Sequence, residues 1–483
     1  MKSQKISSGR PGLDEILIGG FVPHSTNLLR GGPGVGKTTF GLHFLIQGIQ
    51  QKEKCLFITL GESVSNIKRN AAQLGLDIGG IEFLDLSPEP EFFSKVETYD
   101  IFTPAEVERE PTTHKIVEVI DKLKPARVFL DAITQFKFLA VDNFQFRKQA
   151  LSFLHYLQTH KATVLFTTEA SQLAPDDDLQ FMADAVLNLE FSNHSRTLRV
   201  SKFRGSDYIQ GFHGYRIMQG GIEVHPNLVP PLSMGKIATQ QLRFGIPELD
   251  QQLHGGIESA TINIITGHSG VGKTTLCLQL ATQAAKDGFN SILYTFEEEA
   301  HMMASRCKTL KMKTGEALEN KLLSIKKVEP LLYSADEFAH MVREDVKKEN
   351  VSLVIIDSIA GYKISLHDTD IVKKMHALCK FLQNNGITVV LINEIDNITG
   401  DFKITDEGLS YLADNIIFIR FLELKGELTK AIGVLKKRTG SAESTMRRLW
   451  MESGGIHIGE PLTQLRGILR GIPEWTDNDK NDE

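Results

Sequence analysis

Two short stretches of the chain have the spacing of a phosphate-binding loop. They read GGPGVGKT at 31–38 and GHSGVGKT at 267–274, and both fit the pattern G-x-x-x-x-G-K-[ST]. The glycines let backbone N–H groups point at phosphates, the lysine reaches the terminal phosphates, and the threonine hydroxyl binds Mg²⁺. We therefore predict two nucleotide sites, whose contact residues are Gly31, Gly34, Val35, Gly36, Lys37, Thr38 and Thr39 in the first copy and Gly267, Ser269, Gly270, Val271, Gly272, Lys273, Thr274 and Thr275 in the second.

An aspartate follows a short apolar run in each half of the chain. Asp131 closes VFLD and Asp357 closes VIID. An aspartate at the end of a strand is common, but behind a phosphate-binding loop it is the usual second ligand of the Mg²⁺ ion. We predict that Asp131 acts with Thr38 and Asp357 with Thr274 to hold the metal.

The two halves differ where hydrolysis or phosphoryl transfer needs a general base. Glu297 and Glu298 follow the next strand in the second half, whereas the first half has Gly61 and Glu62 at the same places. A carboxylate at a strand end can deprotonate or orient the attacking oxygen. We predict catalytic roles for Glu62, Glu297 and Glu298; the alternative is a solvated acidic pair.

Each half also carries a lysine and an arginine two residues apart near its end. These are Lys202 and Arg204, and Lys436 and Arg438. Residues two apart on a strand share a face. Two cations on one face could bind the phosphates of a neighbouring subunit's nucleotide, as arginine fingers do. The alternative is a solvated basic strand edge.

The elements that must position these residues are themselves duplicated. Apolar, β-branched runs at 26–31, 55–62, 126–132 and 163–169 recur in order at 261–267, 292–299, 351–358 and 388–394. Runs of this kind that alternate with helical patterns indicate a parallel sheet covered by helices on both faces. The proline-containing stretch 225–236 suits a linker. We expect two α/β P-loop domains, 1–232 and 233–483, each a mostly parallel twisted sheet flanked by helices.

Composition narrows the class of protein. The 483 residues are 41% hydrophobic and 24% charged, with a net charge of −6 that argues against a nucleic-acid-coating protein. Four widely spaced cysteines indicate neither a disulfide framework nor a zinc site. The sequence has no apolar leader and no run long enough to span a membrane, so we expect a cytoplasmic protein.

The two loops, the FEE at 296–298, the K-x-R-type strands, the segment ITDEGLSYLADN and the tail RGILRGIPE together resemble the KaiC family of circadian-clock ATPases. The resemblance covers nearly the whole chain. It implies tandem RecA-like domains and a two-tier homohexamer that binds ATP and Mg²⁺ between protomers. It also implies KaiA-like or KaiB-like regulators, an ATPase in the first domain, and a serine/threonine autokinase and autophosphatase in the second.

The resemblance further implies that Glu297 is the base for phosphoryl transfer and that Ser410 and Tyr411 stand at the two phosphoacceptor positions. The chain departs from the family pattern twice, with Gly61-Glu62 in place of two glutamates and Ser410-Tyr411 in place of Ser-Thr. In the first half, Gln180-Phe181 occupies the matching position and lacks an aliphatic hydroxyl.

Two other functions stay open from the sequence. One is a RecA-like ATPase acting on nucleic acid, which would need basic loops or interleaved aromatic residues for strand binding, and neither is evident in the sequence. The other is a ring that assembles around ATP as a scaffold with little kinase activity. A role in a clock and a role in stress signalling are equally compatible with the residues.

Overall fold

The computed structural model describes residues 4–87, 109–140, 142–169, 176–192, 195–230, 240–364, 371–395, 408–424, 426–438, 440, 442–468 and 474–475. By its internal contacts the chain divides into two compact units, Met1–Asn227 and Leu228–Glu483. The predicted domain boundary between 232 and 233 stays a prediction, because residues 231–239 lie outside the described ranges.

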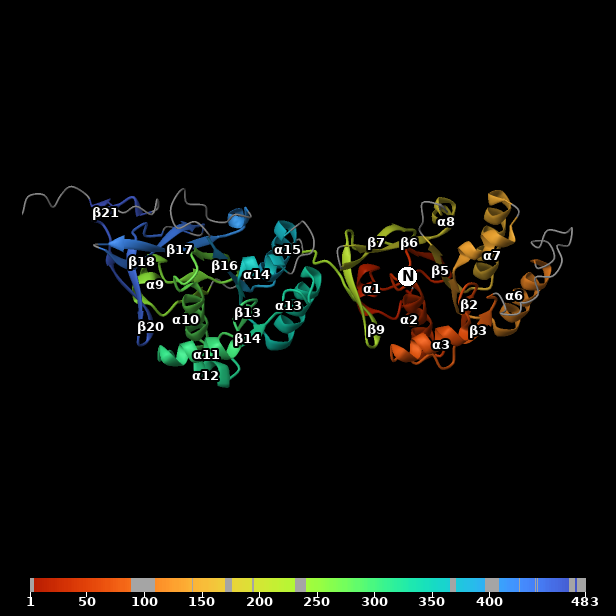
Figure 1. Ribbon diagram of the computed structural model, residues 1–483, viewed down its shortest axis with the longest axis horizontal. Coiled ribbons are helices and arrows are strands. Elements are labelled where there is room, and N and C mark those ends of the chain that lie inside the picture. Colours follow the sequence, from red (N-terminus) through yellow and green to blue (C-terminus); the bar gives the residue numbers. More distant parts are fainter. Residues whose placement is uncertain are drawn as a thin grey trace, which may run out of the picture. The chain divides into compact units, whose positions relative to one another are not determined.

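The first unit is built on one large sheet, flanked by helices (Figure 1). In the described residues its strand order is β3-β2-β4-β5-β1-β6-β7-β8-β9. Neighbours from β3 to β6 pair in parallel, and the pairs from β6 to β9 are antiparallel. The strands are β1 (Thr26–Gly31), β2 (Cys55–Thr59), β3 (Glu82–Asp85), β4 (Arg127–Asp131), β5 (Thr163–Glu169), β6 (Ala185–Ser192), β7 (Ser195–Phe203), β8 (His213–Met218) and β9 (Gly221–His225). The helices are α1 (Pro11–Ile16), α2 (Lys37–Gln50), α3 (Val64–Gln73), α6 (Arg109–Leu123), η1 (Ile133–Leu139, 3₁₀), α7 (Asn143–Thr159) and α8 (Asp177–Met182).

The second unit repeats this plan. Its large sheet has the order β14-β13-β15-β16-β12-β17-β18-β19-β20 in the described residues, with the same change from parallel to antiparallel pairing at β17. The strands are β10 (Gln241–Leu242), β11 (Ile257–Glu258), β12 (Ile262–Gly267), β13 (Ser291–Thr295), β14 (Leu323–Lys327), β15 (Leu353–Asp357), β16 (Thr388–Glu394), β17 (Asn415–Leu424), β18 (Glu427–Lys437), β19 (Arg447–Glu452), β20 (Gly455–Pro461), β21 (Leu465–Arg466) and β22 (Glu474–Trp475). The helices are α9 (Pro247–Gln252), α10 (Lys273–Lys286), α11 (Ala300–Thr309), α12 (Thr314–Glu319), α13 (Ala335–Glu349), α14 (Ile359–Ile364), α15 (Ile371–Asn384) and η2 (Leu409–Tyr411, 3₁₀).

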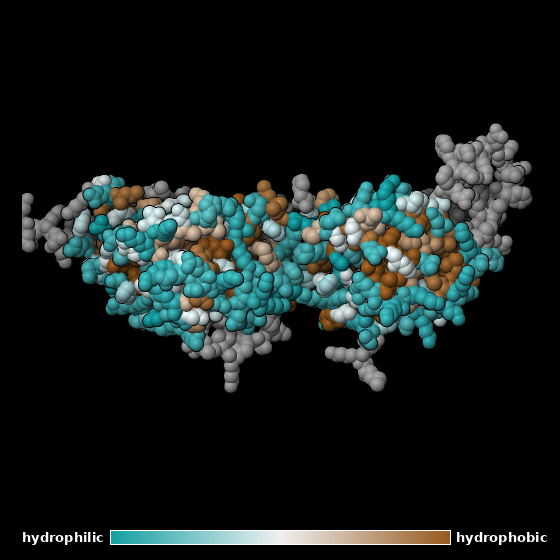
Figure 2. Space-filling model, turned by 90° about the horizontal axis from the view of Figure 1, so that it is seen from below, coloured by the Kyte–Doolittle hydropathy of each residue, from teal (hydrophilic) through white to brown (hydrophobic). Residues whose placement is uncertain are grey.

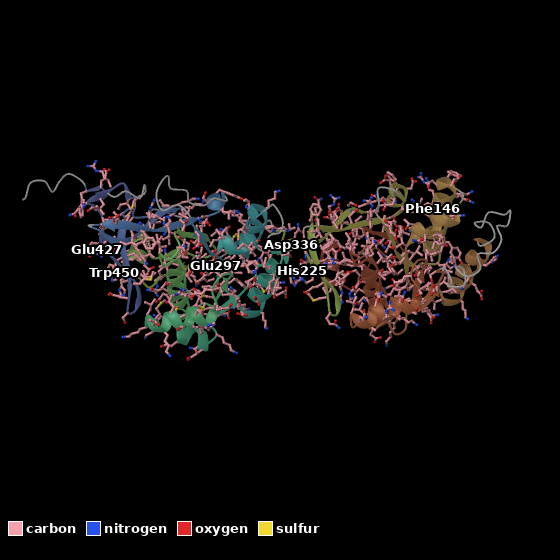
Figure 3. The ribbon with its side chains drawn as sticks, in the orientation of Figure 1. Phe146, His225, Glu297, Asp336, Glu427 and Trp450 are labelled. Atoms are coloured by element: carbon pink, nitrogen blue, oxygen red, sulfur yellow. The ribbon has the colours of Figure 1, made fainter. Side chains whose placement is uncertain are left out.

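Each large sheet has a core on both faces, because successive residues of a buried strand point to opposite sides. Leu28 packs in one core cluster of the first unit and Leu29 in the other. Helix α2 covers one face and α7, which carries Phe146 (labelled in Figure 3), covers the other. The sequence prediction of tandem α/β domains with mostly parallel sheets is therefore confirmed.

One glycine explains how closely α2 can approach the sheet. A Cβ atom added at Gly41 would lie 2.1 Å from Cζ of Phe129 on β4, so any side chain there would push the helix away from the strand. This close packing fixes the start of α2, and with it the phosphate-binding loop, against the end of β4 where Asp131 stands.

Two predictions drawn from composition can be compared with the structure. The four cysteines are buried and free, as expected for residues that pack in the core. In the described part of the chain, no helix combines the length and the apolar character needed to cross a membrane.

Candidate nucleotide and phosphoacceptor sites

Both predicted phosphate-binding loops join the central strand of a sheet to a helix. In the first unit β1 ends at Gly31 and α2 begins at Lys37. Gly34 and Gly36 have φ of 75° and 91°, a left-handed conformation that favours glycine. A Cβ added at Gly32 or Gly34 would meet nothing within 4 Å, so the loop faces open space. These are the features of a phosphate cradle at a helix N-terminus.

The second loop has the same form. Strand β12 ends at Gly267 and α10 begins at Lys273, with Gly270 and Gly272 at φ of 76° and 113°. Ser269 and Gly270 are exposed at the tip. The remaining predicted contacts support the loops from behind: Val35, Val271 and Thr275 are buried, and Thr39 is half-buried at the start of α2.

The loop lysines are folded back over their own loops. Lys37 Nζ donates to the carbonyl oxygens of Gly31 (2.7 Å) and Gly32 (2.8 Å). Burial lowers the pKa of Lys37, and the charges of Asp131 and Glu169 oppose that shift. Lys273 makes the matching bonds to Gly267 and His268, so both ammonium groups lie at the mouth of the loop.

The predicted metal pairs come together in both units. Thr38 Oγ1 donates to Asp131 Oδ2 at 2.6 Å, and Thr274 Oγ1 donates to Asp357 Oδ2 at 2.7 Å. Hydroxyl and carboxylate oxygens are ligands that Mg²⁺ accepts, so this donor set fits the ion. Burial, aided by the charges of Glu297 and Glu298, raises the pKa of Asp357 to about 6 despite the bond from Thr274.

The second unit places a carboxylate beside this metal pair. Glu297, labelled in Figure 3, lies two residues after β13, and Ser358 Oγ donates to its Oε1 at 2.6 Å. Glu298 is turned toward α11, where it pairs with Arg306 at 3.0 Å. Of the two predicted catalytic glutamates, Glu297 therefore contacts the residue that directly follows Asp357.

The first unit presents Glu62 alone. Its Oε1 accepts a bond from Asn70 of α3 at 3.0 Å. Its carbonyl accepts from Thr59, as that of Glu298 does from Thr295, so Glu62 is the structural counterpart of Glu298. Partial burial and the charge of Asp131 raise the pKa of Glu62.

The predicted basic pairs contact the segment at the acceptor position of their own chain. Lys436 Nζ donates to the carbonyl of Ala413 at 2.6 Å, and Arg438 pairs with Asp414 at 2.9 Å. Lys202 donates in the same way to Gln180 and Phe181, and Arg204 lies 3.8 Å from Asp184. Within one chain these cations thus hold the segment at the acceptor position, and a role in binding nucleotide stays a prediction.

The two acceptor residues lie on η2. Ser410 is half-buried, whereas Tyr411 is 52% exposed. The Tyr411 hydroxyl lies 3.0 Å from Nδ1 of His376 on α15, and the two rings are stacked with centroids 6.0 Å apart. The described residues resume at 408, so most of the ITDEGLSYLADN segment before Ser410 lies outside them.

Sequence reasoning missed two residues beside the second phosphate-binding loop. Glu394, the last residue of β16, lies 3.1 Å from Lys273 Nζ. Lys430 of β18 donates to the carbonyl of Gly270 at 3.1 Å. Glu394 could have been found, because the aligned runs TVLFTTE and TVVLINE both end in glutamate, whereas Lys430 carries no such signal.

A cavity of about 500 Å³ adjoins the first phosphate-binding loop. It lies between loop residues 31–35 and residues 188–192 at the end of β6, and the ring of Phe191 lines it. Cavities of roughly 300–1,000 Å³ hold small ligands, so this one has room for the base and sugar of a nucleotide.

A phosphate-binding loop after a central strand, with a threonine–aspartate pair at the neighbouring strand end, defines a RecA-like P-loop protein, here present twice. The family model of the KaiC ATPase matches residues 6–229 and again residues 242–463. The chain belongs to this KaiC ATPase family.

Curated relatives match over nearly their whole length. A circadian clock oscillator protein KaiC of Parathermosynechococcus lividus is 26% identical over 494 residues, which cover 99% of this chain and 90% of the relative. Proteins of the same name from Parasynechococcus marenigrum and Synechococcus elongatus are 25% and 26% identical, covering 100% and 98% of this chain and 96% and 92% of the relatives.

Proposed function

We propose that the chain binds ATP at both loops and uses the two sites for different reactions. The first unit hydrolyses ATP, and the second transfers the γ-phosphate to Ser410 of a neighbouring subunit in a homohexamer. The observation that carries this proposal is the carboxylate difference: Glu297 stands beside the Thr274–Asp357 pair, whereas the first unit has Gly61 at that place.

The residues of the second site suit phosphoryl transfer. Bound Mg²⁺ would neutralise the phosphate charge, with Thr274 and Asp357 as its protein ligands. Lys273 would bind the terminal phosphates, and Glu297 would accept the proton of the Ser410 hydroxyl as the new O–P bond forms. The bond between the γ-phosphorus and the β–γ bridging oxygen breaks, and ADP leaves.

A difference at the acceptor position supports the same division of labour. Lys202 and Lys436 each donate to backbone carbonyl oxygens of these segments, yet the first segment offers Gln180 and Phe181 where the second offers Ser410 and Tyr411. A scaffold with two equivalent nucleotide sites would not require this difference.

The physiological role is proposed at a coarser level. The relatives are named as circadian clock oscillator proteins. We propose a clock-like or stress-signalling switch whose state is set by phosphorylation, with KaiA-like or KaiB-like proteins as regulators.

Site-specific ATP turnover tests the proposal. The Lys273→Ala variant should retain hydrolysis at the first site and lose phosphate incorporation, and Lys37→Ala should lose most hydrolysis. The double variant, as matched control, should lose both activities. Loss of hydrolysis in Lys273→Ala as complete as in Lys37→Ala, or undiminished phosphate incorporation in Lys273→Ala, would contradict separate functions.

A further inference from the structure

Three positions near the reacting groups change together between the two units. In the second unit, Ser358 Oγ donates to Glu297 at 2.6 Å and accepts a bond from the backbone N–H of Gly361 at 3.2 Å. Carboxylate, hydroxyl and glycine thus form one arrangement at the ends of β13 and β15.

The first unit has a different set at the same three places, namely Gly61, Ala132 and Gln135. The equivalence is structural, because Leu60 N donates to Asp131 O as Phe296 N does to Asp357 O. Neither Gly61 nor Ala132 has a polar side chain, so these two residues supply no hydrogen-bonding group in place of Glu297 and Ser358.

Gln135 supplies such a group. It lies on η1 directly after β4, and its side chain lies over Gly61: the three atoms closest to a Cβ built there are Nε2 at 3.8 Å and Cδ and Cγ at 4.0 Å. The amide is therefore beside the point from which the Glu297 side chain starts in the second unit. Gln135 is half-buried, as a group facing a solvent-accessible site should be.

The second unit cannot hold the arrangement of the first. A Cβ added at Gly361 would lie 2.4 Å from Cβ of Phe296, so no glutamine fits at that position in the second unit. The first unit accommodates Gln135 at the matching position, on the 3₁₀ turn η1. Each unit thus brings a polar side chain to this place, Glu297 after β13 in the second and Gln135 from η1 in the first.

We propose that Gln135 orients the attacking water at the first nucleotide site, an inference that rests on the proposed hydrolysis there. Its amide oxygen accepts a hydrogen bond from the water, and its NH₂ group donates to a γ-phosphoryl oxygen, as glutamine does in other P-loop enzymes. The water oxygen bonds to phosphorus, and the bond to the β–γ bridging oxygen breaks with its electron pair leaving on ADP. A neutral amide cannot accept the proton that the water loses, so this proton passes to Glu62. Burial and the charge of Asp131 raise the pKa of Glu62.

The test measures steady-state ATP turnover in a Lys273→Ala background, where only the first site is active. We expect Gln135→Ala to lower kcat about 100-fold, the range for losing one transition-state hydrogen-bonding group, with KM and ATP affinity changed by less than about threefold. Gln73→Ala, at an exposed glutamine of α3, is the control and should leave turnover unchanged.

A rescue variant separates catalysis from folding. Gly61→Glu with Ala132→Ser and Gln135→Gly gives the first site the arrangement of the second, and a Cβ at Gly61 meets no atom closer than 3.8 Å. The kcat of this variant should be at least about tenfold higher than that of Gln135→Ala, since a well-placed carboxylate contributes that much or more. Turnover of Gln135→Ala within twofold of its parent would overturn the inference and leave first-site hydrolysis standing. Absence of turnover in the Lys273→Ala parent would overturn both.

Discussion

Single residues distinguish the two nucleotide sites more than the loops do. In both units the loop lysine donates to two carbonyl oxygens of its own loop. The threonine–aspartate distances also match, at 2.6 and 2.7 Å. The neighbouring glutamates have different partners, because Glu297 accepts a hydrogen bond from Ser358 and Glu62 accepts one from Asn70. Chemistry that depends on a general base should therefore differ between sites that bind nucleotide alike.

Glu62 gives the first site a defined pH dependence. Its pKa is raised by burial and by Asp131, and a general base must be ionised, so turnover should fall as the pH drops through that raised pKa. We expect Glu62→Gln in a Lys273→Ala background to lose about 100-fold in kcat and to lose this acidic limb. A pH–kcat profile checks it, and a variant with unchanged turnover would show that Glu62 is no base.

Ser410 and Tyr411 should differ as acceptors. Tyr411 is held against His376, whose pKa is lowered by burial and by Lys380, so that the neutral ring can accept the phenol hydrogen. Because Ser410 and Tyr411 are adjacent on η2 and their side chains differ in length, we do not expect the two hydroxyls to reach the same γ-phosphate unless this segment moves. We expect tandem mass spectrometry to find that Tyr411→Phe keeps most phosphate and Ser410→Ala loses most of it. Phosphate chiefly on Tyr411 in the unmodified sequence would reverse this assignment.

At the scale of elements, an aspartate ties the segment at the acceptor position to the central strand in each unit. Asp414 is 5% exposed and accepts bonds from Ile262 N, Gln383 Nε2 and Arg438. Asp184 binds Thr26 and Gln158 in the same way. The Asp414 carboxylate thus links the end of the η2 segment to β12.

Removing that carboxylate should destabilise the second unit. Asp414→Ala leaves the buried donors of Ile262 and Gln383 without their acceptor, which costs about 3 kcal/mol in unfolding free energy. Urea unfolding followed by tryptophan fluorescence is suitable, because both tryptophans lie in the second unit. Glu452→Ala, at an exposed carboxylate, is the control; equal midpoints for the two variants would show that Asp414 is not an anchor.

The order of elements could be predicted from the sequence because the signals are local. The apolar runs, the loop glycines and the duplicated spacing sufficed for the two sheets and for the Thr38–Asp131 and Thr274–Asp357 pairs. Gln135 and Lys430 could not be found this way, because their approach to Gly61 and Gly270 depends on how η1 and β18 fold back over the loops. The basic pairs were predicted to share a face, but their partners in the same chain were not foreseen.

At the scale of the whole molecule, the proposal requires subunits to meet at the nucleotide. Each unit exposes large apolar side chains, including Phe144 (77%) and Phe181 (70%) in the first, and Figure 2 shows hydrophobic patches on a largely hydrophilic face. Exposed patches of this kind often mark protein interfaces. A ligand held between protomers stabilises the assembly by mass action.

Assembly should therefore depend on the first loop. We expect the native protein to form hexamers with MgATP in multi-angle light scattering, and Lys37→Ala to shift toward smaller species because it cannot hold the bridging nucleotide. Thr39→Ser, a conservative change in the same loop, should assemble normally. An unchanged hexamer for a Lys37→Ala protein shown not to bind ATP at the first site would contradict this dependence.

The basic pair of the first unit should act across subunits as well as within one chain. Mixed rings of Arg204→Ala and Lys37→Ala subunits contain interfaces with an intact loop from one subunit and an intact arginine from the next. We expect such mixtures to hydrolyse more ATP than the sum of the separate variants. Turnover equal to the sum of the two separate variants would show that Arg204 acts only within its own chain, where it lies beside Asp184.

The central claim is that the second site phosphorylates this protein itself. Tandem mass spectrometry of residues 400–415 after incubation with MgATP tests it most directly, comparing the native sequence with Glu297→Gln. We predict phosphate on Ser410 in the native protein and its near absence in Glu297→Gln, with ATP binding retained. Native protein that binds ATP but carries no phosphate in this segment, or equal phosphorylation of both proteins, would contradict the account.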